Sequence, residues 1–225
     1  MKTILSWSSG KDSAWALHVL RQMPGIEVAG LLTTINEAFD RVSMHGVRRS
    51  LVEAQARAAG LPIHVVELPE SCPNDVYEAR MAAFIETART AGVQAIAFGD
   101  LFLEDIRSYR EAKLQGSGIT PLFPLWGKNT EELAREMISG GVGARIVALD
   151  PRVMRRDLVG RRYDEDFLAA LPPGVDPCGE NGEFHTFVYS GPMFDRELRF
   201  SLGEIVESGG FVFADLDASV AQAVP

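Results

Sequence analysis

The segment Ser8-Ser9-Gly10-Lys11-Asp12-Ser13 combines residue types that suit the binding of an anion. It lies between a short apolar run and a helical pattern, so we expect a loop that leads from a strand into a helix. The first turn of a helix offers unpaired N–H donors and the positive end of the helix dipole. Lys11 adds a positive charge, and the serines add hydroxyl donors. The segment therefore predicts a phosphate-binding loop, while a plain turn capped by Asp12 or Ser13 stays open as the alternative.

A second group of polar residues follows the apolar run 94–98. The carboxylate in Gly99-Asp100 would lie at the carboxyl end of a strand, where it can bind Mg²⁺ or a ribose hydroxyl. Arg107 and Glu111 come four residues apart on an expected helix. That spacing is typical of a surface ion pair, and from spacing alone we favour the ion pair over a role in binding.

The third group, residues 179–186, places Glu180, Glu183 and His185 within six residues. In a strand, Glu183 and His185 would share one face, which suits general acid–base catalysis or cation binding. The spacing is not that of a zinc site. The alternative is a turn that caps the last hairpin, with His185 hydrogen-bonded by a neighbour, and the spacing leaves both interpretations open.

Two single residues give weaker signals. His45 lies in the loop after the second expected strand, and such loops often carry function. Cys178 is a nucleophile only in principle, because a reactive cysteine needs an activating environment that the sequence does not reveal.

The elements that must position these residues are alternating apolar runs and helical patterns. Continuous apolar strands suit a parallel sheet covered on both faces, and repeated β-α-β units predict a doubly wound, mainly parallel Rossmann-like α/β fold. Ligands of such folds bind outside the carboxyl ends of the strands, where Ser8–Ser13 and Gly99-Asp100 would lie. The expected strands are 3–7, 28–34, 63–68 and 94–98, and the expected helices are 13–22, 47–59, 76–91 and 105–115.

The pattern changes around Pro121–Gly127, which holds two prolines and a glycine. We therefore divide the chain into a domain of residues 1–127 and a smaller α/β lobe of residues 128–225. In that lobe we expect a helix at 130–139 and strands at 145–149, 186–189 and 211–214.

Composition limits the function classes. The chain has 225 residues, of which 46% are hydrophobic, without an apolar run long enough to cross a membrane and without a recognisable secretory signal. The formal charge of −9 argues against bulk binding to DNA or RNA. Cys72 and Cys178 do not make a disulfide framework. We expect a cytoplasmic protein with reduced thiols and with neither nucleic acid nor membrane as a partner.

Taken together, these segments resemble the diphthine–ammonia ligase family, the PP-loop ATP-binding proteins of diphthamide synthesis. This family belongs to the N-type ATP pyrophosphatases, with a HUP-type fold related to adenine nucleotide alpha hydrolases. The first loop resembles the PP-loop pattern S-G-G-K-D-S, and Ser9 stands where that pattern has Gly. Ser9 would fit if its φ were negative or its side chain turned outward. The other matching pieces are Ser43 with His45, Gly99-Asp100 with Arg107 and Glu111, Pro124-Leu125-Trp126, 191–194 and, most specifically, 179–186.

The resemblance implies ATP-dependent amide formation. A carboxylate would attack the α-phosphate of ATP, pyrophosphate would leave, and ammonia derived from free ammonium would then displace AMP. The resemblance implies catalytic roles for Lys11, Asp12, Glu183 and His185, and ATP binding by Ser8–Ser13 and Gly99-Asp100. It further implies Mg²⁺ held by Asp12 and Asp100, and an acceptor bound by His45, Arg107, Glu111, Glu180 and Glu183.

The acceptor is the open question. Within the family it would be diphthine on elongation factor 2, while a bacterial relative would adenylate another small carboxylate or amide acceptor. A sensor that binds an adenine nucleotide without turning it over is a different class of protein with the same loop. The ionisable segment 179–186 favours catalysis over sensing. The sequence leaves the oligomeric state open, with a homo-oligomer among the alternatives.

Overall fold

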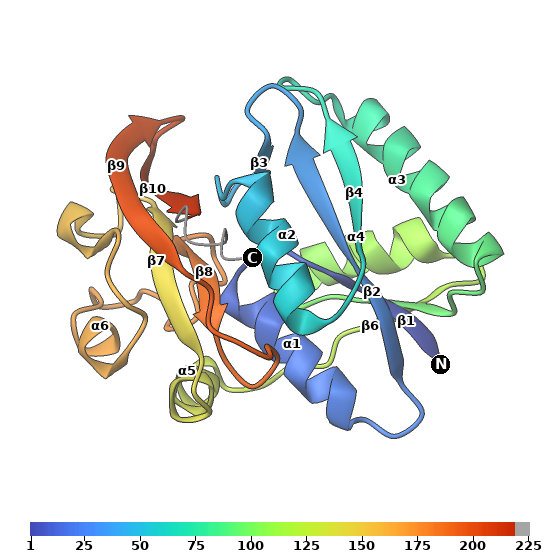
Figure 1. The fold of residues 1–225 in the computed structure, drawn as a ribbon, viewed down its shortest axis with the longest axis horizontal. Coiled ribbons are helices and arrows are strands. Elements are labelled where there is room, and N and C mark those ends of the chain that lie inside the picture. Colours follow the sequence, from blue (N-terminus) through green and yellow to red (C-terminus); the bar gives the residue numbers. More distant parts are fainter. Residues whose placement is uncertain (219–225) are drawn as a thin grey trace, which may run out of the picture.

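Two β-sheets lie side by side in the computed structural model, which describes residues 1–218 (Figure 1). The strands of the first sheet are β1 (Lys2–Ser6), β2 (Glu27–Asn36), β3 (Arg41–Val42), β4 (Ile63–Leu68), β5 (Ala95–Ala97) and β6 (Thr120–Leu122). The helices that follow them are α1 (Lys11–Gln22), α2 (Arg49–Ala59), α3 (Asn74–Thr90) and α4 (Glu104–Leu114).

The first sheet confirms the predicted Rossmann-like fold. β1 pairs in parallel with β2 and β5, β2 with β4 and β5 with β6, and only the short β3 runs antiparallel among the strands of this sheet in residues 1–218. Neighbouring apolar residues serve opposite faces, as strand geometry requires. Leu5 and Ala97 join the hydrophobic cluster that contains α1 and α2, whereas Ile4 and Ile96 join the cluster beneath α3 and α4.

The second sheet has the order β8-β7-β10-β9, and all its pairs are antiparallel. Its region contains α5 (Thr130–Ser139), β7 (Gly143–Leu149), η1 (Arg156–Leu158), α6 (Glu165–Ala169), β8 (Phe184–Ser190), β9 (Phe200–Ser208) and β10 (Phe211–Ala218). The sequence did not predict β9. Almost all of its side chains are exposed, so neither an alternating pattern nor a continuous apolar run marks it.

The segment expected to be a boundary is partly a strand. Thr120–Leu122 pairs with β5 at the edge of the first sheet, where a proline such as Pro121 is tolerated because one side of the strand needs no hydrogen bonds. The division proposed after residue 127 falls in the connection between β6 and α5. The lobe proposed for residues 128–225 extends beyond the described residues.

The two sheets share one layer of helices. A continuous hydrophobic cluster contains Leu17 of α1 and Leu51 of α2 together with Ile146 of β7 and Phe187 of β8. The second sheet therefore packs on the helices that cover the first. This arrangement brings the N-terminus of α1 next to β8, at the carboxyl end of β1 (Figure 1).

Ion pairs also join the two halves of the molecule, which are the first sheet with its helices and the region of the second sheet. Arg41 and Arg48, before α2, contact Asp215 of β10, and hydrogen bonds from Arg48 hold the pKa of that carboxyl well below its usual range.

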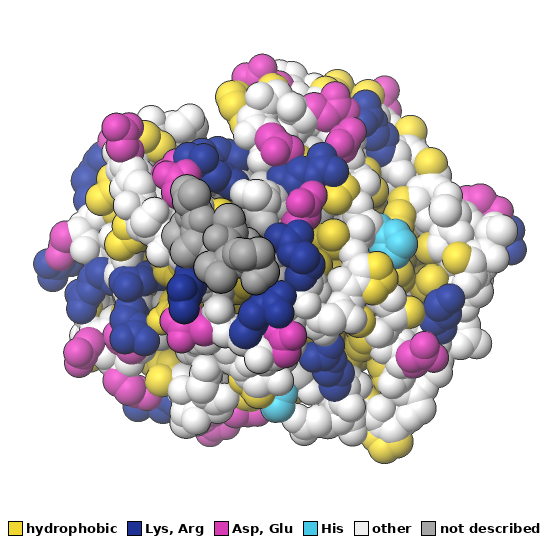
Figure 2. Space-filling model, in the orientation of Figure 1, with side chains coloured by type: hydrophobic (Ala, Val, Ile, Leu, Met, Phe, Trp, Pro, Cys, Tyr) yellow, Lys and Arg dark blue, Asp and Glu magenta, His cyan; other side chains and the backbone are white. Residues whose placement is uncertain are grey.

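On the face shown in Figure 2, Lys and Arg side chains are interspersed with Asp and Glu. Within residues 1–218, none of the helices has the length and hydropathy needed to cross a bilayer.

Candidate functional site

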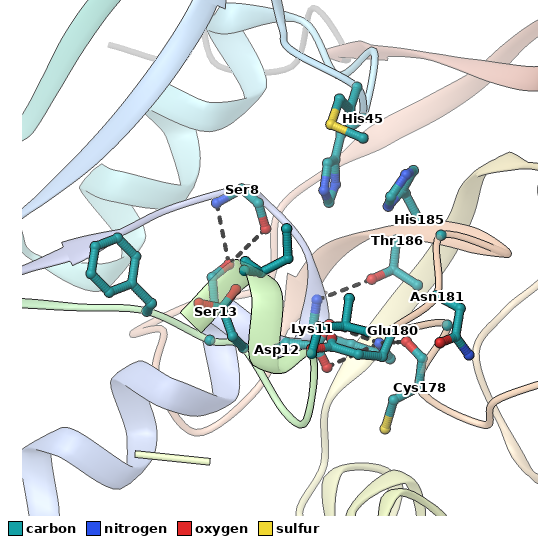
Figure 3. A pocket seen from close by; sticks show the side chains of 18 of the residues that line it. Ser8, Lys11, Asp12, Ser13, His45, Cys178, Glu180, Asn181, His185 and Thr186 are labelled. Carbon is teal, nitrogen blue, oxygen red and sulfur yellow. Dashed lines mark hydrogen bonds and ion pairs between the residues drawn. The ribbon is translucent and has the colours of Figure 1, made fainter. Parts of the chain in front are cut away.

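The three segments selected from the sequence meet at a cavity of about 390 Å³ (Figure 3). Lys11 and Asp12 line it from the start of α1, Gly99 and Asp100 from the end of β5, residues 178–182 from the loop before β8, and His185 from β8. Segments that are far apart in the sequence therefore form one site, at the edge of the parallel sheet where ligands of this fold class bind.

The phosphate-binding loop has a strained residue. α1 begins at Lys11 with Gly10 at its N-cap, and no side chain caps it, so the alternative of a plain Asp12 or Ser13 cap is wrong. Ser9 has a φ of 72° and is fully buried. Both conditions under which Ser9 was expected to fit are therefore unmet. The left-handed backbone explains why a glycine suits this position, since glycine alone has no Cβ to clash.

Glycines allow the close approach of the loop to its surroundings. A Cβ on Gly99 would lie 3.0 Å from the backbone of Asp12 and Ser13, so β5 can touch the start of α1 only without a side chain there. A Cβ on Gly10 would lie 3.1 Å from His45 Cε1 and 3.3 Å from the Thr186 carbonyl oxygen. The loop is thus enclosed by both halves of the molecule.

Serine hydroxyls and the second sheet hold the loop in shape. The Ser13 hydroxyl donates to the Gly10 carbonyl at 3.0 Å and lies 3.3 Å from the Ser8 hydroxyl. The backbone N–H of Lys11 donates to Thr186 Oγ1 at 3.0 Å. One donor of the first helical turn is therefore satisfied by β8, which connects the loop to the second sheet.

Lys11 is a buried cation in the wall of the cavity. Its Nζ donates to both carboxylate oxygens of Asp12, at 3.0 and 2.8 Å, and to the Cys178 carbonyl. Burial opposes the charge, but Asp12, together with Cys178 and Glu180, outweighs burial and raises the pKa of Lys11 above its ordinary value. Lys11 therefore stays charged at neutral pH and places a positive charge in the wall of the cavity.

Glu180 connects the second sheet to the end of β5. Its Oε1 accepts a hydrogen bond of 2.7 Å from the Leu101 backbone N–H. Burial, together with the nearby Asp12 and Asp100 carboxylates, raises its pKa to about 7. Its carboxyl group can therefore exchange a proton near neutral pH inside the cavity.

Glu183 lies just before β8, outside the strand in which it was expected to share a face with His185. β8 begins only at Phe184, and Glu183 turns into the loop before it. Its Oε1 accepts hydrogen bonds of 3.0 Å from the Asp176 backbone N–H and from Asn181 Nδ2, while Oε2 is buried without a partner among residues 1–218. The Glu183 side chain lies behind the cavity lining and shapes the loop that carries Glu180.

His45 and His185 stack on each other at the cavity, with ring centroids 4.4 Å apart (Figure 3). Burial and the Lys11 charge lower the pKa of His185 to about 4. Burial and the neighbouring His185 ring lower the pKa of His45 well below its usual value. Both rings are neutral at pH 7. His185 lies in a strand, so the hairpin-turn alternative for this residue is wrong.

The ion pair favoured for Arg107 and Glu111 is present, with a distance of 2.8 Å. The Arg107 guanidinium also lies over the rings of Phe123 and Trp126, at 5.0 and 4.7 Å from their centroids. Neither Arg107 nor Glu111 lines the cavity. The structure therefore places these two residues beside the site and not in it.

Sequence reasoning missed Arg110. This residue lines the cavity and forms a bidentate pair with Asp100, with distances of 2.6 and 3.0 Å. The sequence held no local signal for this role, because only the fold shows that Arg110 and Ile106, one helical turn apart, both face the site. Cys178, in contrast, is buried, and burial raises the pKa of its thiol to about 12, which argues against a nucleophile.

Comparison with known sequences agrees with this geometry. Residues 1–121 match the sequence model of the diphthamide synthase N-terminal domain, and residues 129–216 match that of the diphthamide synthase C-terminal domain. The chain belongs to the diphthamide synthase family.

Relatives in this family carry the name diphthine–ammonia ligase. The protein of that name from Homo sapiens is 32% identical over 92% of this chain and 85% of its own length. The Danio rerio protein is 24% identical over 95% of this chain and 92% of its own length. The Schizosaccharomyces pombe protein is 24% identical over 98% of this chain, which spans 40% of that longer protein.

Proposed function

We propose that this diphthamide synthase family member is an ATP-dependent amide ligase that adenylates a carboxylate and amidates it with ammonium, as in the conversion of diphthine to diphthamide. The observation that carries the proposal is the meeting of Lys11 and the N-terminus of α1 with Glu180 and His185 in one cavity. The names of the relatives support the same reaction class. Residues 1–127 would bind ATP, and residues 128–225 would form the acceptor side.

A second cavity is the site that we propose for the nucleoside of ATP. It measures about 670 Å³, lies over the carboxyl ends of β1, β2 and β4, and shares part of its lining with the first cavity. Apolar residues such as Leu32 and Met81 line it, and the buried Thr33 hydroxyl has no partner among residues 1–218. Apolar walls suit a base and a free hydroxyl suits a polar ring atom or a ribose. We therefore assign adenosine to this cavity and the outer phosphates to Ser8–Ser13.

Adenylation transfers charge to the departing pyrophosphate. A carboxylate oxygen of the acceptor bonds to the α-phosphorus, and the bond from that phosphorus to the bridging oxygen breaks with its electron pair on pyrophosphate. Lys11 and the N–H donors of α1 stabilise that growing charge because they are already in position. Asp12 keeps Lys11 charged and oriented until the phosphates arrive.

Asp12 and Asp100 would hold Mg²⁺ that arrives with ATP through the carboxylate lone pairs that their ion pairs with Lys11 and Arg110 leave free. Magnesium is commonly held by one or two carboxylates together with substrate phosphates. Both carboxylates line the cavity, and residues 1–218 contain no cluster of three or more acidic, His or Cys residues that would form a complete protein cage. When bound, Mg²⁺ neutralises charge on the phosphate oxygens.

Amidation needs a neutral nitrogen nucleophile. Ammonium gives up a proton to become ammonia, which attacks the acyl carbon, and the carbon–oxygen bond to AMP breaks with its electron pair on AMP, while the nitrogen loses a second proton to solvent and becomes the neutral amide. The neutral rings of His45 and His185 can accept hydrogen bonds from ammonia without repelling it. Glu180, with a pKa of about 7, can take up a proton released there. Glu183 would act by holding the Glu180 loop.

The roles of Arg107 and Glu111 are assigned differently from the first expectation. Since neither lines the cavity, we assign them to holding α4 against Phe123 and Trp126. The partners in the proposed reaction are ATP, ammonium and a carboxylate acceptor, of which diphthine on elongation factor 2 is the first to test.

Product analysis tests the proposal. The protein is incubated with ATP, Mg²⁺, ammonium and diphthine-bearing elongation factor 2, and AMP, pyrophosphate and modified acceptor are measured. We expect all three in equal amounts, with an acceptor carboxylate oxygen labelled with heavy oxygen recovered in AMP. Lys11→Ala should lower AMP formation by roughly 100-fold, since it removes the main cation of the loop. Lys113→Ala, on the exposed side of α4, should leave it unchanged.

Three outcomes separate the alternatives. Formation of ADP and phosphate would exclude attack at the α-phosphate. ATP binding without turnover on any carboxylate acceptor would favour a nucleotide sensor. Turnover with a small carboxylate but not with elongation factor 2 would keep the adenylation and replace the acceptor. Circular dichroism of Lys11→Ala and of Lys11→Arg distinguishes lost chemistry from lost folding, because Asp12 loses its partner in the alanine variant.

A further inference from the structure

The two cavities meet along a shared rim. Six residues line both of them, and these residues therefore mark the passage from one cavity to the other: Ser6, Ser8, Met44, His45, Phe98 and Arg110. With adenosine in the larger cavity and the outer phosphates at Ser8–Ser13, the α-phosphate must cross this rim. The rim is thus the place where the reacting phosphorus would lie.

Arg110 gives the rim a permanent positive charge, because a guanidinium group does not lose its proton in proteins. The other basic side chain of the rim, His45, is neutral. The Arg110 Nε donates to Asp100 Oδ2 at 2.6 Å and its Nη2 to Asp100 Oδ1 at 3.0 Å. The guanidinium carbon lies 4.3 Å from the centroid of the Phe98 ring. Asp100 on one edge and Phe98 on one face therefore fix the position of the guanidinium group before any ligand binds.

The Arg110 guanidinium keeps donors for a ligand. An arginine has five N–H donors, and the bidentate pair with Asp100 uses two of them. Among residues 1–218, Asp100 is the hydrogen-bond partner of this side chain, so three N–H donors remain. The planar arrangement of these donors matches the oxygens of a phosphate group, with which arginine forms charge-assisted hydrogen bonds.

We propose that Arg110 binds the α-phosphate of the nucleotide and that Lys11 binds the phosphates beyond it. This assignment rests on the proposed function. Which phosphate lies at Arg110 follows from the placement of adenosine in one cavity and of the outer phosphates in the other. Arg110 is then the group that holds the phosphorus in place for attack, and Asp100 is the positioning residue that orients Arg110. Lys11, at the start of α1, lines the first cavity and is absent from the lining of the second.

Nucleotide affinities separate the two cations. Dissociation constants for adenosine, AMP and ATP with Mg²⁺ are measured by titration calorimetry on the whole protein. Arg110→Ala should weaken AMP and ATP by about 10-fold or more and leave adenosine unchanged, because AMP carries the α-phosphate alone. Lys11→Ala should weaken ATP strongly and leave AMP nearly unchanged. Arg110→Lys should recover part of the AMP affinity, since it keeps the charge without the planar donors.

The matched control is Lys113→Ala. Lys113 is also a cation on α4, pairs with Glu78 at 2.7 Å and lies 5.4 Å from the centroid of the Tyr109 ring, but it lies outside both cavities. We expect it to leave all three affinities unchanged. Thermal denaturation of each variant shows whether a lost affinity reflects lost folding, and Arg110→Lys keeps the comparison valid if Arg110→Ala unfolds.

Each result bears on the assignment. If Arg110→Ala and Arg110→Lys weaken adenosine as much as AMP, Arg110 shapes the cavity and does not bind the phosphate. If Arg110→Ala weakens ATP but not AMP, Arg110 binds an outer phosphate and the assignment of the rim is overturned. If the unaltered protein binds neither AMP nor ATP, the proposed function fails and this assignment fails with it.

Discussion

Ser9 shows how the structure resolves a departure from the family pattern at the level of a single residue. Its backbone lies in the left-handed region with φ 72°, and its buried hydroxyl has no hydrogen-bond partner among residues 1–218. The positive φ costs free energy because it crowds Cβ against the backbone. The buried hydroxyl costs free energy because it gives up its hydrogen bonds to water without replacing them. The loop therefore keeps its shape because neighbouring hydrogen bonds impose it, and not because serine prefers it.

We predict that Ser9→Gly stabilises the protein by about 1 kcal/mol, because glycine adopts a positive φ without strain and leaves no unpaired hydroxyl. The measurement is the free energy of unfolding from urea denaturation. Ser8→Gly is the matched control and should destabilise, since the Ser8 hydroxyl contacts Ser13 Oγ and the Gly10 N–H. Equal effects of the two substitutions would show that backbone strain at Ser9 is not the cause.

Elements that are distant in the sequence are joined by Gln55 of α2. Its side chain is fully buried, accepts from Trp7 Nε1 at 2.8 Å, and donates to the carbonyls of Ser9 and Val188 at 3.0 and 2.7 Å. One amide thus connects the end of β1, the phosphate-binding loop and β8. Nothing in the sequence indicates this role, because the position of Gln55 in a helix does not reveal which residues of other elements pack against its side chain.

We predict that Gln55→Ala costs roughly 3–5 kcal/mol in the free energy of unfolding, because it leaves Trp7 Nε1 and two carbonyls buried without partners. Gln55→Glu should also destabilise, since a carboxylate cannot donate to the two carbonyls. Urea denaturation measures both. Gln22→Ala, at an exposed position of α1, should change stability by less than about 0.5 kcal/mol, and a similar loss there would refute the special role of Gln55.

At the scale of the whole molecule, His45 and His185 form part of the contact between the two halves. His45 comes from the first sheet's side, His185 from β8, and Lys11 lies close enough to lower the pKa of His185. Protonation of either ring would place a second positive charge in a buried contact. The association of the two halves is therefore linked to pH.

We predict that stability falls as the pH drops from 6.5 toward 4. In this range the unfolded chain binds a proton at residue 185, whereas the folded protein, with the pKa of His185 near 4, does not. The stabilising effect is complete above pH 6.5, is lost on acidification, and amounts to roughly 3 kcal/mol. Urea denaturation at several pH values should give a shallower decline for His185→Gln than for the unaltered protein. Parallel declines would contradict the prediction.

Local physics made much of this molecule predictable. Apolar runs and helical periodicity were enough for β1, β2, β4 and β5 of the parallel sheet but not for β6, and α5 has the predicted bounds of Thr130–Ser139. The residue types in Ser8–Ser13 were enough for an anion-binding loop, because the donors of a helix N-terminus are a local property. Edge and exposed strands such as β9 were not predictable, since their side chains are not selected by burial.

The sequence by itself determined the elements, the chemistry of the loop and the family resemblance, because these depend on neighbours along the chain. Only the tertiary structure decided which charges meet. It paired Arg110, at the rim of two cavities, with Asp100, and it left Glu183 and Arg107 outside the cavity lining. Pairing and burial depend on distances between segments far apart in sequence, and those distances exist only once the two sheets have packed on their shared helices.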